Sequence, residues 1–235
     1  MTTIHLQVLR FTSVLAIFSA PLANAAVPEI AAALRQQYGD AHLQNVVLFR
    51  ASPSTIAPIQ WNIYSKDPYR PGELIRTTAT LNGAQWVTSP NGAGSNLLQR
   101  TPPKTLDLKR VRVDSAQALD VAKKAAALAQ VTVSQAAYQL ATNDTNLVPE
   151  WGVELRDPTG FEIGFCVVSA ETGALVHQSW TPKTAASTSK SQSEPETEGE
   201  IAAKKVKKGV RKAWNWTEDA GKTTGSFFRE LFKGE

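Results

Sequence analysis

Gly221, Lys222 and Thr223 stand in the stretch EDAGKTTGSFFRELF, and their chemistry would be phosphate binding. In a phosphate-binding loop these residues close the pattern G-x-x-x-x-G-K-[ST], in which backbone N–H groups and the lysine surround the phosphates. The position five residues before Gly221 is Trp216 instead of glycine, and about a dozen residues follow Thr223, too few for the α/β domain that the loop requires. The sequence therefore excludes nucleotide binding, and we expect no cofactor.

The other reactive residue types lack partners at useful spacings. Cys166 stands alone in the alternating run FEIGFCVV, which predicts a buried, inert thiol on a strand. His42 and His177 are far apart and have no nearby cysteine or acidic cluster, so a zinc site has no ligand set. The S-x-x-K pattern from Ser187 to Lys190 falls in a Ser/Thr-rich linker. We therefore expect a non-catalytic protein without a catalytic, cofactor or metal site.

An internal repeat accounts for the most conspicuous aromatic and acidic residues. IQWNIYSKDPYRPGELIRTTATLNGAQWV aligns with PEWGVELRDPTGFEIGFCVVSAETGALV, which indicates a duplicated unit. The equivalent positions, ninety residues apart, are Trp61 and Trp151, Asp67 and Asp157, Pro68 and Pro158, and Gly83 and Gly173. Asp-Pro pairs open turns, so we interpret the aspartates as turn residues rather than catalytic carboxylates. We interpret the tryptophans as core or inter-copy packing rather than as ligand platforms.

The first copy is predicted to hold one helix and three strands. The helix covers PEIAAALRQQY, with Pro28 at its start and Gly39 beyond its end. The strands are QNVVLFR, IQWNIYS and ELIRTTATL, and a turn follows at Asn82 and Gly83. SPNGAGSN and RTPPK have loop compositions, and LDLKRVRV is compatible with a further short strand.

The second copy repeats this arrangement more clearly. Asp114 or Ser115 caps an alanine-rich helix, with Gln117 at the capping-box distance from Asp114. Strands follow at SQAAYQL, WGVELR and FEIGFCVV, and a last strand follows the turn at Thr172 and Gly173. The run from Asp157 to Gly160 has the residues that a type I turn prefers.

These elements predict an α+β fold of two tandem copies, each a helix packed on a small antiparallel sheet, plus a C-terminal amphipathic helical tail. The expected organisation is a signal peptide (1–25), a first unit (26–89), a connecting segment (90–113), a second unit (114–182), a disordered linker (183–200) and the basic tail (201–235).

The second copy resembles the PepSY domain family. The resemblance rests on the alanine-rich helix, on PEWGVELRDPTG and on the run from Ala170 to Gly173, and it covers about residues 114–180, with a degenerate likeness over 28–88. Ser169 stands where the family usually has Asp. The resemblance implies a non-catalytic module of exported and cell-envelope proteins, of a kind proposed to restrain proteases.

The first 25 residues have the pattern of a secretion signal. A weakly charged start precedes the apolar run FTSVLAIFSA, and Ala23-Asn24-Ala25 is a small-x-small cleavage site. We expect cleavage after Ala25 and export to the periplasm or cell envelope of a bacterium. An uncleaved amphipathic anchor is the alternative.

The basic charge is concentrated in the tail. At helical spacing its apolar and basic residues fall on opposite faces, a pattern typical of helices that lie on membrane surfaces. The residues expected to attach to a membrane or partner are Lys204, Lys205, Lys207, Lys208, Arg211, Lys212, Trp214, Phe228 and Phe232.

Three partners remain open for this tail: an anionic membrane surface, a protein groove, or the protein's own domains. Nucleic acid is not expected, since it would leave the apolar face unused. The predicted function is a module that binds or restrains another envelope protein, such as a protease, and is tethered by its tail. The alternative is a structural or assembly component of an envelope complex, with the tail as a docking helix.

Overall fold

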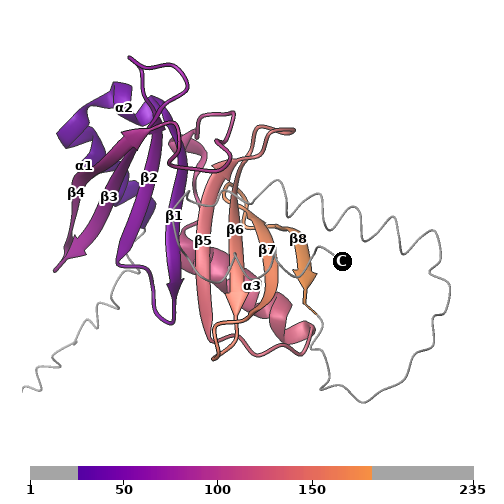
Figure 1. Cartoon of the computed structure of the whole chain (residues 1–235). Coiled ribbons are helices and arrows are strands. Elements are labelled where there is room, and N and C mark those ends of the chain that lie inside the picture. The colour runs from indigo at the N-terminus through magenta and orange to yellow at the C-terminus, as the bar shows by residue number, and fades with distance from the viewer. Residues whose placement is uncertain (1–25, 182–235) are drawn as a thin grey trace, which may run out of the picture.

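The computed structural model describes residues 26–181 (Figure 1). The expected signal peptide, linker and basic tail lie outside these residues. In chain order the elements are α1 (Ala26–Tyr38), α2 (Asp40–Gln44), β1 (Val46–Ser54), β2 (Gln60–Lys66), β3 (Leu74–Asn82), β4 (Gln85–Gly94), the 3-10 helix η1 (Leu108–Arg110), α3 (Ser115–Leu128), β5 (Gln135–Thr142), β6 (Pro149–Arg156), β7 (Glu162–Ser169) and β8 (Leu175–Trp180).

The fold class expected from the sequence is wrong. All eight strands form one antiparallel sheet in the order β4-β3-β2-β1-β5-β6-β7-β8, instead of two small sheets (Figure 1). Strand is the dominant structure, and the helices are few and short. The described chain is therefore a mostly antiparallel-sheet fold, in which β1 of the first copy pairs with β5 of the second.

Edge strands explain why the two copies merge. In a separate four-stranded sheet, β1 or β5 would be an edge with a row of unpaired N–H and C=O groups. Their pairing satisfies both rows, with Phe49 opposite Leu140 and Arg50 opposite Gln139. The side chains on both sides of this junction are largely buried and apolar, so separating the copies would also expose core surface.

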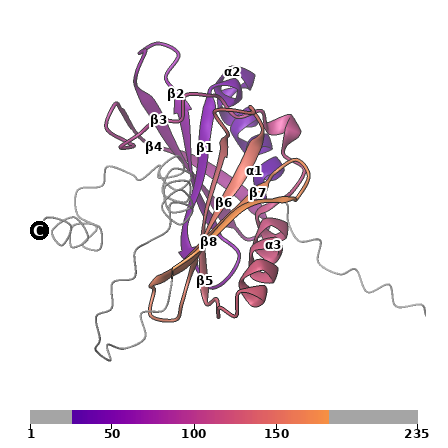
Figure 2. The same ribbon diagram turned by 90° about the vertical axis from the view of Figure 1, so that its right-hand side faces the viewer.

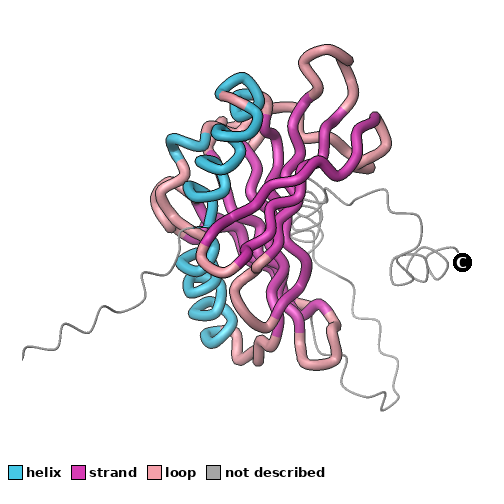
Figure 3. The backbone as a smooth tube through the Cα atoms, turned by 90° about the vertical axis from the view of Figure 1, so that its left-hand side faces the viewer, coloured by secondary structure: helices cyan, strands magenta, loops and turns pink. Residues whose placement is uncertain are grey.

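The helices cover one face of the sheet, and the other face carries no helix among residues 26–181 (Figures 2 and 3). Helix α1 contacts β4, and α3 contacts β6, β7 and β8. Helix α3 buries its alanines, whose small side chains let it approach the sheet closely: Ala118, Ala122, Ala125 and Ala126. Its N-terminus confirms the predicted capping box, since the Asp114 carboxylate accepts from the Gln117 backbone and the Gln117 side chain accepts from the Asp114 backbone.

The main core lies between the sheet and the helices. Trp61 and Trp151 are both fully buried there, with ring centroids 5.9 Å apart. Tyr138 completes the aromatic cluster at 6.0 Å from Trp61. The expectation that the tryptophans pack in the core and between the copies is confirmed.

Two local expectations fail between the copies. Strand β4 continues through Ser89 to Gly94, where the composition predicted a loop, because β3 pairs with it along this length. Pro90 is tolerated since β4 is an edge strand and one of its sides needs no N–H donors. The segment LDLKRVRV contains the short η1 and no strand, and the Asp107 carboxylate caps this turn by accepting from the Lys109 backbone.

Candidate functional site: a polar hollow between the two copies

Strand registers place one residue of every strand in a single row across the helix-free face. Residues directly opposite each other in neighbouring strands point to the same side of a sheet. From one edge to the other, the row consists of Ser89, Thr78, Asn62, Arg50, Gln139, Gly152, Val167 and His177. The adjacent row, which includes Phe49, Leu140 and Trp151, belongs to the helix-side core. The helix-free face therefore has Arg50 and Gln139 at its centre.

These two residues mark the approximate two-fold axis that relates the copies. Asn62 follows Trp61, and Gly152 follows Trp151, so Asn62 and Gly152 are equivalent positions. Arg50 lies opposite Asn62, as Gln139 lies opposite Gly152, which makes Arg50 and Gln139 equivalent as well. Equivalent positions of the two copies therefore follow in the same order in both directions along the row, starting from the junction between β1 and β5.

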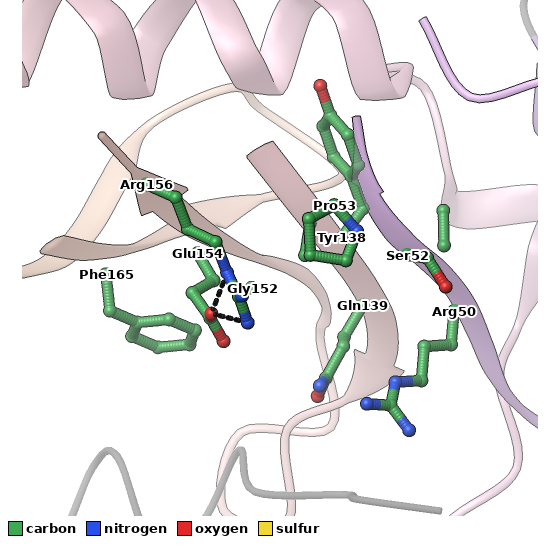
Figure 4. A pocket seen from close by; sticks show the side chains of 11 residues that line it. Arg50, Ser52, Pro53, Tyr138, Gln139, Gly152, Glu154, Arg156 and Phe165 are labelled. Carbon is green, nitrogen blue, oxygen red and sulfur yellow. Dashed lines mark hydrogen bonds and ion pairs between the residues drawn. The ribbon is translucent and has the colours of Figure 1, made fainter. Parts of the chain in front are cut away.

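A hollow of about 90 Å³ opens beside this junction, on the side of the second copy (Figure 4). Strands β1, β5, β6 and β7 supply its lining: Arg50, Ala51, Ser52, Pro53, Ala137, Tyr138, Gln139, Gly152, Glu154, Arg156 and Phe165. Figure 4 shows the Tyr138 ring turned toward the helix side, whereas the Arg50 and Gln139 side chains extend the opposite way. The hollow is thus a feature of the helix-free face.

The difference between Asn62 and Gly152 explains why the hollow lies in the second copy. The Asn62 side chain occupies the first-copy position, where its Oδ1 accepts from Thr78 Oγ1 at 3.1 Å. Gly152 has no side chain at the equivalent place, and its neighbour corresponding to Thr78 is Val167. A glycine inside a regular strand often marks a site where another group approaches the backbone closely.

The polar groups of the hollow differ in how far they are satisfied. Arg156 and Glu154 form an ion pair at 2.7 Å, and Arg156 also donates to the Gly160 carbonyl oxygen at 3.3 Å. The Arg50 side chain makes no hydrogen bond or ion pair within residues 26–181, and the buried Gln139 Oε1 accepts no hydrogen bond there. Buried polar atoms are normally paired, so an unpaired acceptor beside an unpaired cation is a feature that needs an explanation.

The lining contains no histidine or cysteine, and Cys166 belongs to the helix-side core. Burial raises the pKa of the Cys166 thiol to about 11, which keeps it protonated and unreactive at neutral pH. Within the described part of the chain, no three His, Cys, Asp or Glu residues are grouped so that they could hold a metal ion.

The two predicted turn aspartates are confirmed as turn residues. Asp67 Oδ1 accepts from the backbone N–H groups of Tyr69 and Arg70 at 2.8 and 3.2 Å. Asp157 Oδ1 accepts from the backbone N–H groups of Thr159 and Phe161 at 2.9 and 3.0 Å. The hydroxyl of Thr159, followed by these backbone groups, lowers the pKa of Asp157. Both carboxylates therefore stabilise turns.

Ser169 and His42 also have local structural partners. Ser169 accepts from the backbone N–H groups of Glu171 and Thr172 at 3.3 and 3.2 Å. A serine hydroxyl can hold this turn in place of a carboxylate. His42 Nε2 lies 3.2 Å from Ser65 Oγ, outside the hollow.

The sequence patterns do not predict the hollow. The sequence pattern around Arg50 and Gln139 does not indicate a catalytic or ligand-binding site, and Gly152 falls in a predicted strand. The signal was present in the repeat alignment, where Gly152 replaces Asn62. The nine tail residues predicted to bind a membrane or partner lie outside the described residues.

No protein-family model, curated protein or solved structure matches this chain. The resemblance to PepSY domains therefore stays a prediction from the sequence. Among residues 26–181, none of the helices has the length and apolar character needed to cross a membrane.

Proposed function

We propose that this chain is an exported, non-catalytic binding module that holds a segment of another cell-envelope protein against its helix-free sheet face. The observation that carries this proposal is the hollow between the copies, where the Arg50 side chain and the Gln139 amide oxygen are without partners among the described residues. Both groups are strongly polar, and a partner that supplied the missing contacts would be stabilised there.

In this proposal the bound segment belongs to a protein that the module restrains, such as a protease of the bacterial cell envelope. The PepSY-like sequence features support that role, and the secretion-signal pattern supports the location. The basic tail attaches the module to an anionic membrane surface or to the same partner, through the residues from Lys204 to Phe232 named above.

Site-specific photo-crosslinking tests where the partner binds. A photoreactive amino acid replaces Ser52 in the hollow, and a matched control replaces Leu128, whose side chain is 89% exposed on α3 at the helix side. After irradiation of intact cells, we expect a discrete adduct from position 52 and none from position 128. Adducts of equal yield from both positions, or none from position 52, would contradict the proposal.

The adduct also separates restraint from assembly. A restrained protease, once identified by mass spectrometry, should lose peptidase activity when the purified module is added. A stoichiometric envelope complex without enzymatic activity would instead favour the structural alternative, with the tail as a docking helix.

A further inference from the structure

The charge balance of the hollow leaves one cation available to a ligand. Arg156 and Glu154 neutralise each other at 2.7 Å, so the remaining charge of the lining is that of Arg50. An arginine is charged at any physiological pH and presents several N–H donors in a planar fork that suits a carboxylate. The free positive charge selects for an anionic group.

Gln139 adds a second requirement. It lies directly opposite Arg50 on the neighbouring strand, and its buried Oε1 can only be satisfied by a hydrogen-bond donor. A ligand that serves both residues must therefore carry a carboxylate and an N–H group a few ångströms apart. An acidic residue within a polypeptide has both, in its side chain and its backbone amide.

The size of the hollow restricts the ligand further. A volume of about 90 Å³ corresponds to about three water molecules, whereas pockets for cofactors and drug-sized molecules span roughly 300–1,000 Å³. One short side chain fills the space. Phe165 lies at the far wall, on the strand next to Gly152 (Figure 4).

We propose that the hollow binds a single Asp or Glu side chain of an extended segment of the partner, with its carboxylate on Arg50 and a backbone N–H donating to Gln139 Oε1. This inference rests on the proposed function and specifies what the helix-free face recognises. Arg50 is its selectivity residue, and Gly152 provides the space that the side chain enters.

A peptide array tests the selectivity directly. Synthetic nine-residue peptides of randomised sequence are probed with the purified full chain, and the best binders are remade with a fluorescent label. We expect the selected peptides to share one acidic position. Replacing that acidic residue by its amide should weaken binding by about tenfold or more, as expected when a charged hydrogen bond is lost.

Two variants in the hollow and one control variant connect this preference to the hollow. Arg50→Gln should weaken the acidic peptide by about tenfold or more and leave the amide peptide unchanged, because the two substitutions remove the same contact. Arg35→Gln makes the same charge change on α1, where Arg35 is paired with Asp40 at 2.7 Å, and should have no effect. Gly152→Asn introduces the side chain found at Asn62 and should abolish binding by filling the hollow.

The outcomes separate this inference from the function on which it rests. The inference would be overturned if the selected peptides shared no acidic position. It would also be overturned if the Arg50→Gln variant, with an unchanged urea midpoint, bound the acidic peptide as well as the wild type does. In either case, crosslinking at position 52 would still support a binding face. Acetate that competes as strongly as the peptide on a molar basis would overturn the extended segment as the ligand. If neither peptide nor crosslinked partner is found, both proposals fail.

Discussion

Trp61 and Trp151, ninety residues apart in the sequence, pack against each other with ring centroids 5.9 Å apart and planes inclined by 58°. They occupy equivalent positions in the two copies, yet their indole nitrogens have different surroundings. Trp151 Nε1 donates to the Val113 carbonyl oxygen at 2.8 Å, whereas the buried Trp61 Nε1 has no hydrogen-bond acceptor among the described residues. The two tryptophans that join the copies therefore occupy equivalent positions, but only one of their indole N–H groups is hydrogen-bonded among the described residues.

This asymmetry predicts unequal costs for the same substitution. Trp151→Phe removes an N–H donor that is hydrogen-bonded, so the Val113 carbonyl oxygen loses that hydrogen bond. Trp61→Phe removes an N–H donor that has no acceptor among the described residues. Because both changes delete the same ring volume, the difference isolates the hydrogen bond. We expect Trp151→Phe to lower the free energy of unfolding by about 1–3 kcal/mol more than Trp61→Phe, measured by urea denaturation. Equal losses would contradict this assignment.

His42 should make stability fall in mildly acidic solution. Burial lowers the pKa of His42 below its usual 6.5, so the unfolded chain takes up the proton first as the pH falls. Its contribution to stability is present above pH 6.5 and is lost below it. The pKa values of Asp157 and Glu171 are also lowered. Carboxyl groups ordinarily titrate at about pH 4, so these two groups affect stability only at pH values lower than those at which His42 does.

The measurement compares urea midpoints of wild type and His42→Gln between pH 7 and pH 5. We expect the variant to show a shallower decline over this interval, since it has no group at position 42 to protonate. Parallel declines in the two proteins would show that burial at this position does not oppose protonation.

Cys166 should resist thiol reagents in the folded protein. Its side chain is fully buried, and burial raises the pKa of the thiol to about 11, so both access and the thiolate form are lacking at pH 7.5. We expect labelling by an aromatic disulfide to be slower by orders of magnitude in buffer than in denaturing urea. Rapid stoichiometric labelling of the native protein would place the thiol in a reactive setting and contradict the structural role.

The tail prediction is tested with vesicles. Each basic residue near an anionic surface contributes about 1 kcal/mol, so replacing Lys204, Lys205, Lys207, Lys208, Arg211 and Lys212 with Gln should weaken binding to phosphatidylglycerol-containing vesicles by about a hundredfold or more. A version ending at Pro182 serves as the control without the tail, and added salt should release the wild-type protein. Undiminished binding by the six-Gln variant would rule out electrostatic attachment.

Local sequence signals predicted local structure well. The capping residues of α3, the Asp157 turn and the strand that contains Cys166 are determined by neighbours close in the chain, and each is present as predicted. The join between β1 and β5 depends on which strand edges remain free, and alternation along a strand carries no information about that. Strand β4 similarly follows its pairing with β3, against the preference of its Pro, Asn and Gly residues for a loop.

The candidate site was harder to predict because it depends on an absence. The hollow exists where Gly152 omits the side chain that Asn62 supplies in the first copy, and a single glycine in a strand is a weak signal without its register. Arg50 and Gln139 become neighbours only through the inter-copy pairing, which the expected separate sheets did not contain. Because the pairing of β1 with β5 was not predicted, neither the continuous sheet nor the site at its centre could be predicted.

Arg50 lies opposite Gln139, and this unlike pair is possible because the two units belong to one chain. Two separate chains of one unit, joined edge to edge by the same strand, would build an equivalent sheet, but identical subunits must present identical residues at a two-fold axis. An arginine there would face another arginine, and the two like charges would repel each other. Joining the units in one gene removes that constraint, so each half can mutate alone. A cation can then stand next to a neutral amide, and a glycine on one side need not open a second cavity on the other.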